Sequence, residues 1–186
     1  MNEKFRLVTD SQVILKELMV PSYANFGGKV HGGVILSLMD KIAYTCAASH
    51  AKSYCVTASV DSVNFLNPVE VGELLTLYAS VNYVGRSSME VGIRVESEDF
   101  HAGVCKHTNT SYFSMVALNE ETRKPLAVPG LILSSETEVQ RFVKGKLRKL
   151  AKRQYTEDFA KLGDDLDFAQ EATKLKKENC KIKLPK

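Results

Sequence analysis

The sequence contains no long uninterrupted apolar run. Its most apolar stretch, residues 30–51, carries Asp40 and Lys41 near its middle, whereas a membrane-spanning helix needs about 20 consecutive apolar residues. The first ten residues hold four charged side chains and are followed by no apolar run. We therefore expect neither a membrane span nor a secretory signal.

Cysteine is sparse in the 186 residues, with four side chains at positions 46, 55, 105 and 180. No CxxC pair occurs, and no group of cysteine and histidine has the spacing of a zinc finger. A disulfide framework is not expected at this length and density. The pattern favours four reduced thiols in a cytoplasmic protein.

A strong excess of one charge is also missing. The 25 basic and 22 acidic residues give a net charge of +3, which is too small to indicate nucleic-acid binding by itself. The charges are nevertheless unevenly divided, because residues 1–130 carry 11 basic and 13 acidic side chains and residues 131–186 carry 14 and 9. This change in composition predicts a domain over residues 1–130 and an extension over residues 131–186.

Hydrophobic periodicity is clearly present and changes along the chain. Between residues 34 and 51 apolar side chains recur at three- and four-residue steps, which predicts a helix. Other apolar side chains lie on its remaining sides, so we expect this helix to be buried nearly all round. A period of two, or a strand-like composition, predicts five strands, at residues 5–19, 54–66, 73–84, 89–97 and 104–118.

The connections between the last four predicted strands are short and turn-like, at residues 67–73, 85–88 and 100–103. Connections this short predict antiparallel neighbours, because a parallel crossover needs a dozen or more residues. The order of one strand, one helix and four strands excludes a doubly wound α/β fold. It predicts an α+β fold in which one curved antiparallel sheet wraps around one long central helix.

The C-terminal extension has a different character. Residues 141–153 hold seven basic groups and no acid, and residues 157–171 hold six acids and one lysine. Apolar residues from Val139 to Ala151 recur at helical spacing, which predicts an amphipathic helix followed by a charged, partly disordered tail. We interpret the extension as a solvated or subunit-packing appendage rather than a segment that binds nucleic acid or membrane.

Asp40 is the first candidate functional residue, because it lies midway along the most apolar helix. A buried carboxylate is costly unless it is paired or hydrogen-bonded. Asp40 and Lys41 either share a single wet edge of the helix, or Asp40 is held in place as a general base or nucleophile.

The second candidate is the run His31-Gly32-Gly33 at the start of the same helix. Free N–H groups at a helix start favour negative charge, and the glycines leave space for a carbonyl oxygen that becomes an oxyanion. Alternatively, the glycines only permit a tight loop and close packing. His31 is a catalyst or a helix cap, and Asn25 orients a water or carbonyl or is a turn residue.

Taken together, these residues form a segment, NFGGKVHGGVILSLMDKIA at residues 25–43, that resembles the active-site segment of hotdog-fold acyl-CoA thioesterases. Two later segments, VDSVNFLNPVEVGE at residues 60–73 and YVGRSSMEV at residues 83–91, resemble the subfamily of brain acyl-CoA hydrolase and its bacterial short-chain relatives. The resemblance covers residues 8 to about 129. The HGG-to-Asp spacing is also similar to that of phenylacetate-pathway thioesterases, and many members of the subfamily have phenylalanine where this chain has His31.

The resemblance implies a hotdog-fold hydrolase of lipid metabolism that splits acyl-CoA into a free acid and coenzyme A without a metal or bound cofactor. It implies a homo-oligomer whose smallest active unit is a homodimer with sites at the interface, often a trimer of dimers, or hexamer. The residue matching Asp40 attacks the thioester or activates a water, and the residue matching Asn25 places the water or the substrate. A helix-start N–H, at Gly32 or Gly33, polarises the thioester carbonyl.

The same resemblance implies a turn near the nucleotide end of coenzyme A, made of Gly85, Arg86, Ser87 and Ser88. A guanidinium fork, hydroxyls and backbone N–H groups suit the phosphates of this ligand. The alternative is a tight hairpin with an exposed arginine. We expect Asn64 and Asn67 on the same rim.

Two other functions stay open. One is a non-catalytic acyl-CoA-binding regulatory hotdog protein, and the pair of Asn25 and Asp40 argues against it. The other is a hotdog hydroxyacyl dehydratase that pairs a histidine such as His31 with an acid across the interface, but the chain lacks the separate upstream histidine loop. The basic tail has no helix-turn-helix pattern, so we expect no nucleic-acid partner.

Overall fold

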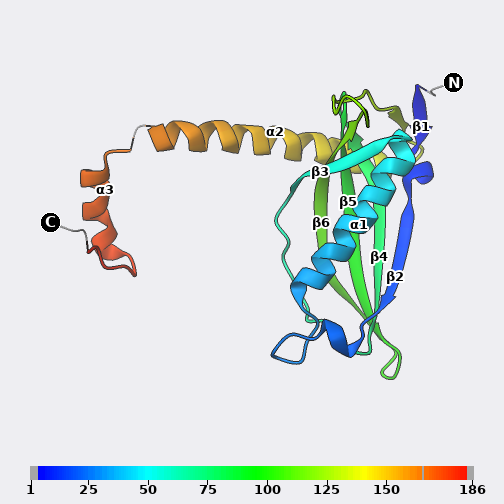
Figure 1. The fold of residues 1–186 in the computed structure, drawn as a ribbon, viewed down its shortest axis with the longest axis horizontal. Helices are drawn as coiled ribbons and strands as arrows, with labels where there is room; N and C mark the ends of the chain where they lie inside the picture. Colours follow the sequence, from blue (N-terminus) through cyan, green and yellow to red (C-terminus); the bar gives the residue numbers. More distant parts are fainter. Residues whose placement is uncertain (1–3, 165, 184–186) are drawn as a thin grey trace. The chain divides into compact units, whose positions relative to one another are not determined.

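The computed structural model describes residues 4–164 and 166–183 (Figure 1). Contacts within the chain divide it into two units, Met1–Gly145 and Lys146–Lys186. The first unit contains the sheet and the long apolar helix.

The first unit is built on a five-stranded antiparallel sheet with the order β2-β4-β5-β6-β3. Its strands are β2 (Val13–Leu18), β3 (Tyr54–Val60), β4 (Leu74–Val84), β5 (Ser88–Asp99) and β6 (Val104–Leu118). Alternate residues of the central strands point into the core, and Met89, Val91, Ile93 and Val95 are each at most 1% exposed. The predicted period of two is therefore confirmed for the central strands.

Helix α1 (Gly32–Ala51) lies along one face of this sheet (Figure 1). Its sheet-facing side chains, among them Met39, Ile42 and Cys46, are at most 1% exposed. The predicted α+β hotdog arrangement is thus confirmed. The expected burial nearly all round is wrong, because the sheet covers only one side of α1 and leaves Leu36 and Tyr44 exposed at 39% and 43%.

The predicted first strand is broken into two. Strand β1 (Phe5–Leu7) pairs in parallel with β7 (Gly130–Ile132) in a separate two-stranded sheet. A short 3-10 helix, η1 (Val8–Ser11), separates β1 from β2. The break has a tertiary cause, because the buried Ser11 hydroxyl donates to Val8 O at 2.7 Å and accepts from Val81 N of β4 at 3.0 Å.

The connection at residues 67–73 does not join neighbouring strands, so that prediction is wrong. Strand β3 lies at one edge, and both β6 and β5 separate it from β4. Helix α1 connects β2 at one edge of the sheet to β3 at the other edge, and residues 61–73 connect β3 to β4. The turns at 85–88 and 100–103 do join antiparallel neighbours, as predicted.

Helix α2 (Glu136–Asp164) begins in the first unit and covers part of the outer face of the sheet. The Phe142 ring lies 5.0 Å from that of Tyr83, and a Cβ on Gly145 would meet the Cβ of Tyr83 at 2.6 Å. Glu90, which lies on the face of β5 opposite that of Met89 and Val91, is therefore only 8% exposed. Contacts of this kind extend the first unit to Gly145, beyond the expected boundary at residue 130.

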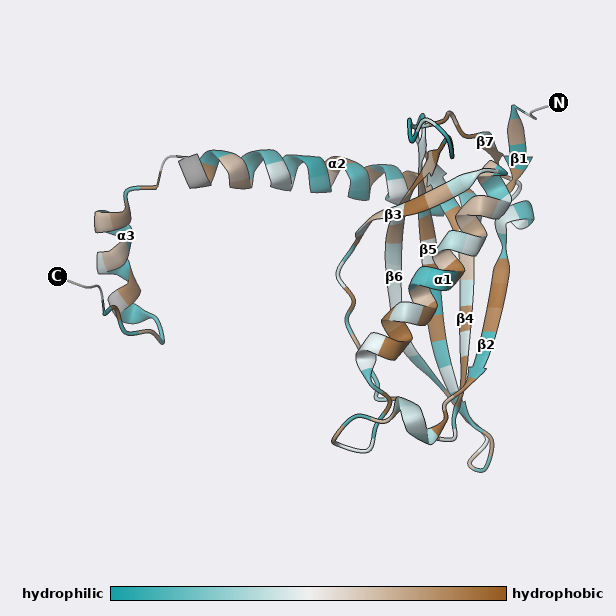
Figure 2. Ribbon diagram, viewed as in Figure 1, coloured by the Kyte–Doolittle hydropathy of each residue, from teal (hydrophilic) through white to brown (hydrophobic). Residues whose placement is uncertain are grey.

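The second unit is helical and strongly charged. Figure 2 shows hydrophilic and hydrophobic residues alternating along α2, and Arg153 and Glu157 pair at 2.7 Å across one turn. Two short helices follow, α3 (Phe168–Lys174) and η3 (Leu175–Lys177). The predicted helix is confirmed. Residues 165 and 184–186 of the expected tail lie outside the described residues.

Candidate active site

The predicted site residues lie at three levels along α1. Asn25 and His31 precede its first turn, and Asp40 lies near its middle. The turn at residues 85–88 lies near its other end, because Arg86 O accepts from Val128 N at 3.0 Å and the neighbouring Pro129 O bonds the ring of His50 at 2.9 Å. A 20-residue helix is about 30 Å long. One chain therefore does not bring all the predicted residues together.

His31 is the N-cap of α1 and has extended backbone angles. Its Nδ1 accepts a hydrogen bond from Gly33 N at 2.9 Å, which places the ring proton on Nε2 if the ring is neutral. Within one chain, His31 therefore acts as a helix cap. Of the two predicted oxyanion donors, the Gly33 N–H is already used, whereas the described residues offer the Gly32 N–H no acceptor.

Asn25 closes the loop that precedes α1. Its Oδ1 accepts from Gly27 N at 2.8 Å and from Lys29 N at 3.2 Å, and its backbone N–H donates to Lys29 O at 2.7 Å. The side chain is exposed. The side-chain oxygen is thus committed to the turn, which leaves the amide nitrogen for a water or a substrate.

The segment at residues 67–73 holds this loop in place. Val30 N donates to Val69 O at 2.9 Å, and Lys29 forms an ion pair with Glu70. The segment is itself fixed by Glu73, whose carboxylate bonds Lys106 Nζ at 2.6 Å and accepts from a backbone N–H of the same segment. The ion pairs of Lys29 with Glu70 and of Lys106 with Glu73 therefore hold the Asn25 loop in place.

Asn64 and Asn67 lie at the first end of α1 and not on one rim with the turn at 85–88. Asn67 Nδ2 donates to His107 O at 2.9 Å, and the ring of Phe65 would lie 3.3 Å from a Cβ placed on Gly32. One chain does not bring these asparagines beside that turn, because the segment from β3 to β4 crosses the sheet at the opposite end. Their place on a rim shared with the turn stays a prediction.

The turn between β4 and β5 is a tight one. Gly85 N donates to Ser88 O at 2.7 Å, and the carbonyls of Arg86 and Ser87 accept from backbone N–H groups of residues 128 and 117. The Arg86 side chain is exposed. The turn is thus held by its backbone while the guanidinium projects from it, a geometry that fits either interpretation of this turn.

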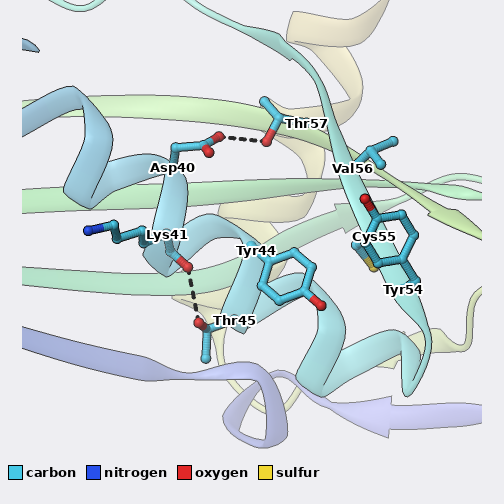
Figure 3. A pocket seen from close by; sticks show the side chains of 8 residues that line it. All are labelled: Asp40, Lys41, Tyr44, Thr45, Tyr54, Cys55, Val56 and Thr57. Atoms are coloured by element: carbon cyan, nitrogen blue, oxygen red, sulfur yellow. Dashed lines mark hydrogen bonds between the residues drawn. The ribbon is translucent and has the colours of Figure 1, made fainter.

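Asp40 is exposed beside Lys41 on the uncovered side of α1. Its Oδ1 accepts a hydrogen bond of 2.6 Å from the hydroxyl of Thr57 on β3 (Figure 3). The wet-edge interpretation describes its position correctly, and Thr57 adds a specific partner. The other carboxylate oxygen is left for a water or substrate.

Thr57 is the functional candidate that the sequence analysis missed. The pairing of β3 with β6 shifts between Thr57 and Ser59, and bulges of this kind re-aim side chains near active sites. The period of two in residues 54–66 does not say which face of β3 is buried. The buried side chain is Cys55, and Thr57, two residues later, lies on the same face and reaches Asp40 of α1. A hydroxyl on that face of the strand after the helix was the available signal.

A cavity of about 550 Å³ opens beside this pair (Figure 3). It lies between α1 and β3 and is lined by Asp40, Lys41, Tyr44, Thr45, Tyr54, Cys55, Val56 and Thr57. Burial raises the pKa of the Cys55 thiol to about 11, against a weaker opposing hydrogen bond at Ser53. The thiol is therefore protonated near neutral pH and is not a competing nucleophile, since the thiolate is the reactive form.

Within residues 4–164 and 166–183, no three side chains of histidine, cysteine, aspartate or glutamate come together as a metal site. In the same residues, no helix has the length and apolar character needed to cross a membrane. A reaction without metal or bound cofactor stays a prediction.

Comparisons with known proteins give a consistent set of relatives. Residues 27–103 match the family described as the thioesterase superfamily. The chain is 42% identical over 153 residues to protein VdlD of Helicobacter pylori, a match that covers 82% of this chain and 85% of VdlD. It is 38% identical over 159 residues to the cytosolic acyl coenzyme A thioester hydrolase of Rattus norvegicus, covering 83% of this chain and 42% of that longer protein.

Solved structures are similar as well. One is described as an apo-hexameric acyl-CoA thioesterase, with 35% identity, a TM-score of 0.79 and coverage of 82% of this chain and 97% of that one. Another is the acyl-CoA hydrolase of Staphylococcus aureus with one aspartate changed to alanine, at 28% identity, a TM-score of 0.77 and coverage of 87% and 99%. A structure of the same hydrolase with one threonine changed to alanine has 28% identity, a TM-score of 0.74 and coverage of 87% of this chain and 99% of that one. A third, with one asparagine changed to alanine and in complex with coenzyme A, has 31% identity, a TM-score of 0.71 and coverage of 86% and 99%.

Proposed function

The chain belongs to the thioesterase superfamily, and from this premise we propose that it is an acyl-CoA thioesterase that hydrolyses acyl-CoA to a free carboxylic acid and coenzyme A. The observation that carries the proposal is the Asp40 carboxylate, held by Thr57 at the mouth of a cavity. An exposed carboxylate with one oxygen fixed and the other open is suited to general-base or nucleophilic work.

In the proposed reaction, Asp40 takes a proton from a water whose oxygen attacks the thioester carbonyl carbon. The carbonyl π electrons move to the oxygen and return as the C–S bond breaks, and the proton then passes to the leaving thiolate. If Asp40 instead attacks directly, an anhydride forms and water hydrolyses it in a second step. In either route Thr57 positions the carboxylate by donating a hydrogen bond from its hydroxyl to Oδ1.

The oxyanion donor comes from a second copy of the chain. Gly32 and Asp40 are eight residues apart on one helix, a separation of about 12 Å. A carbonyl oxygen and its own carbon cannot lie within hydrogen-bonding reach of both. This separation supports a homodimer as the smallest active unit, and the hexameric structural relative supports a trimer of dimers.

The roles of Asn25, Asp40 and Thr57 draw support from the Staphylococcus aureus hydrolase. The asparagine, aspartate and threonine changed to alanine there are separated by 15 and 17 positions, the same spacings as in this chain. In the proposed site Asn25 places the attacking water or the substrate through its amide nitrogen. Gly32 stabilises the oxyanion, His31 caps the helix that presents it, and Gly33 is bound by that cap.

Coenzyme A binds along the outer rim in this proposal. The exposed guanidinium of Arg86 and the donors of Ser87 and Ser88 face the phosphates, with Gly85 shaping the turn. Asn64 and Asn67 lie near the opposite end of α1, so they line the rim only through the second copy. The chain works in the cytoplasm, which the name of the rat relative and the four free cysteines support.

The test measures free thiol release from acyl-CoAs between acetyl and palmitoyl, with Asp40→Asn, Asn25→Ala and wild type compared. We expect wild type to turn over and Asp40→Asn to lose about a hundredfold or more, as for a lost general base. The proposal fails if no acyl-CoA is cleaved or if Asp40→Asn matches wild type. Tight coenzyme A binding without turnover would identify a regulatory acyl-CoA-binding protein instead.

A further inference from the structure

The cavity continues past the catalytic pair toward the second half of α1. Tyr44 follows Asp40 by one helical turn on the same uncovered side, and Tyr54 opens β3 opposite it (Figure 3). Nothing in the proposed reaction uses this part of the cavity. What it accepts depends on which lining groups still need a hydrogen-bond partner.

The polar lining groups are largely satisfied within the chain. The Thr45 hydroxyl donates to Lys41 O at 3.0 Å, the Thr57 hydroxyl donates to Asp40, and the Cys55 thiol donates to Ser53 O at 3.5 Å. In Figure 3 the ammonium group of Lys41 points away from the tyrosines. Among the described residues the hydroxyls of Tyr44 and Tyr54 have no hydrogen-bond partner, so the surface offered to an occupant consists of ring faces, the Val56 side chain and these two uncharged hydroxyls. That lining suits an uncharged acyl chain and not a charged one.

The two tyrosines lie together in the part of the cavity away from Asp40 (Figure 3). Their ring centroids lie 6.3 Å apart at an angle of 60°, within the range of favourable aromatic pairs. The Arg123 guanidinium lies 5.3 Å from the centroid of the Tyr54 ring. Arg123 is itself fixed in a turn, with φ of 55° and its N–H donated to Asn119 O at 2.9 Å. The Tyr54 ring is therefore packed against a fixed guanidinium group.

We propose that Tyr44 and Tyr54 form the end wall of the acyl subsite and set the longest acyl chain that the enzyme accepts. The inference rests on the proposed function, because it takes the thioester carbon to lie at Asp40. One helical turn, about 5.4 Å, separates Asp40 from the wall. That distance holds a few methylene groups, so the substrates are short-chain acyl-CoAs.

The experiment compares kcat/KM for butyryl-, octanoyl-, dodecanoyl- and palmitoyl-CoA among wild type, Tyr44→Ala, Tyr54→Ala and Tyr54→Phe. Each methylene excluded from a fitted pocket is worth about tenfold or more in discrimination. We expect the ratio of dodecanoyl to butyryl turnover to rise at least about tenfold in both alanine variants. Tyr54→Phe keeps the ring and should keep the wild-type ratio, as should Tyr155→Ala, a matched control in the second unit.

Tyr44 is 43% exposed on a helix, where alanine is the best helix former, so Tyr44→Ala carries the test even if Tyr54→Ala fails to fold. An unchanged chain-length profile in folded alanine variants overturns the inference alone. So does a wild type that hydrolyses palmitoyl-CoA as efficiently as butyryl-CoA. A wild type that cleaves no acyl-CoA overturns the proposed function, and the inference with it.

Discussion

The two carboxylate oxygens of Asp40 have different surroundings. One oxygen accepts the Thr57 hydroxyl at 2.6 Å, and the other faces the cavity. A side chain on an exposed helix edge would otherwise sample several rotamers. The threonine selects one of them, so in the proposed reaction β3 and α1 together define where a water would be activated.

Removing this hydroxyl gives a prediction at the residue scale. A hydrogen bond to a charged group is worth about 1.5–3 kcal/mol, so Thr57→Val should lower kcat by about ten- to a hundredfold with little change in KM. Thr57→Ser keeps the hydroxyl and should retain most activity. Steady-state kinetics on the best acyl-CoA checks both variants, and equal kcat for valine and wild type would contradict the positioning role.

His50 gives a second prediction at this scale. It is fully buried at the end of α1 and bonds Pro129 O through Nε2, and its Nδ1 has no partner among the described residues. Burial lowers the pKa of His50 and the nearby Arg6 lowers it further, against the opposing effects of the Pro129 bond and Asp10. In the unfolded chain His50 therefore binds a proton near the ordinary histidine pKa of about 6.5, whereas in the folded chain it stays neutral to a lower pH.

Because the unfolded state binds more protons, the free energy of unfolding should fall as pH drops below about 6.5. The contribution of this group is at most about 1.4 kcal/mol per pH unit, and it ends below the folded-state pKa. Urea denaturation between pH 5 and 8 measures it. His50→Gln retains a donor for Pro129 without titrating, so its stability curve should be flatter than that of wild type in this range.

Single residues also mark what the sequence can and cannot disclose. Asp40 and the glycines at the start of α1 were found because a carboxylate and a run of glycine are unusual in an apolar helical pattern. Thr57 was missed because a single hydroxyl within the period-two pattern of residues 54–66 does not show that its strand face meets Asp40 of α1. The role of His31 as a cap depends on ring geometry that no pattern contains.

At the scale of elements, the segment at residues 67–73 acts as a brace for the loop that carries Asn25. The segment accepts a hydrogen bond from Val30 N and forms an ion pair with Lys29 of the loop. It is fixed to β6 by the ion pair of Glu73 with Lys106. Glu73 is only 4% exposed. The brace therefore links the position of Asn25 to a nearly buried ion pair.

Lys106→Ala leaves the Glu73 carboxylate without its cation and should lower the free energy of unfolding by about 3 kcal/mol. The double variant Lys106→Met with Glu73→Gln removes both charges and should recover part of that loss. Chemical denaturation measures the stabilities, and kcat reports whether the Asn25 loop has moved. A stable Lys106→Ala variant would show that water replaces the ammonium group.

Elements set by local periodicity were predicted well, and elements set by distant contacts were not. Helix α1 and β4 to β6 follow their own apolar spacing, and β6 matches the predicted bounds of residues 104–118. The break between β1 and β2 depends on Ser11 bonding Val81, 70 positions away. The burial of Glu90 depends on α2, which no local pattern reveals.

At the scale of the whole molecule, the separation of Gly32 from Asp40 would, on the proposed mechanism, make the active site a property of a pair of chains. Asn25 and Gly32 lie together before α1, and Asp40 lies two turns further on. In a two-fold dimer each site would take its base from one copy and its oxyanion donor from the other.

This arrangement predicts complementation between two inactive variants. Asn25→Ala and Asp40→Asn, co-expressed and purified as a mixed dimer by separate tags, should regain activity because one of the two sites keeps both native residues. Random mixing should give about a quarter of the wild-type number of sites. Thiol release from the isolated mixed dimer checks this, and a mixed dimer as inactive as its parents would place Asn25 and Asp40 on the same chain.

The eight-residue interval between Gly32 and Asp40 also ties activity to abundance. On the proposed mechanism a lone chain carries two half-sites and no complete one, so its folding alone produces no catalyst. The number of working sites then follows the law of mass action and falls faster than the protein concentration once the pair begins to dissociate. A newly synthesised chain would be inert toward thioesters until it meets a second.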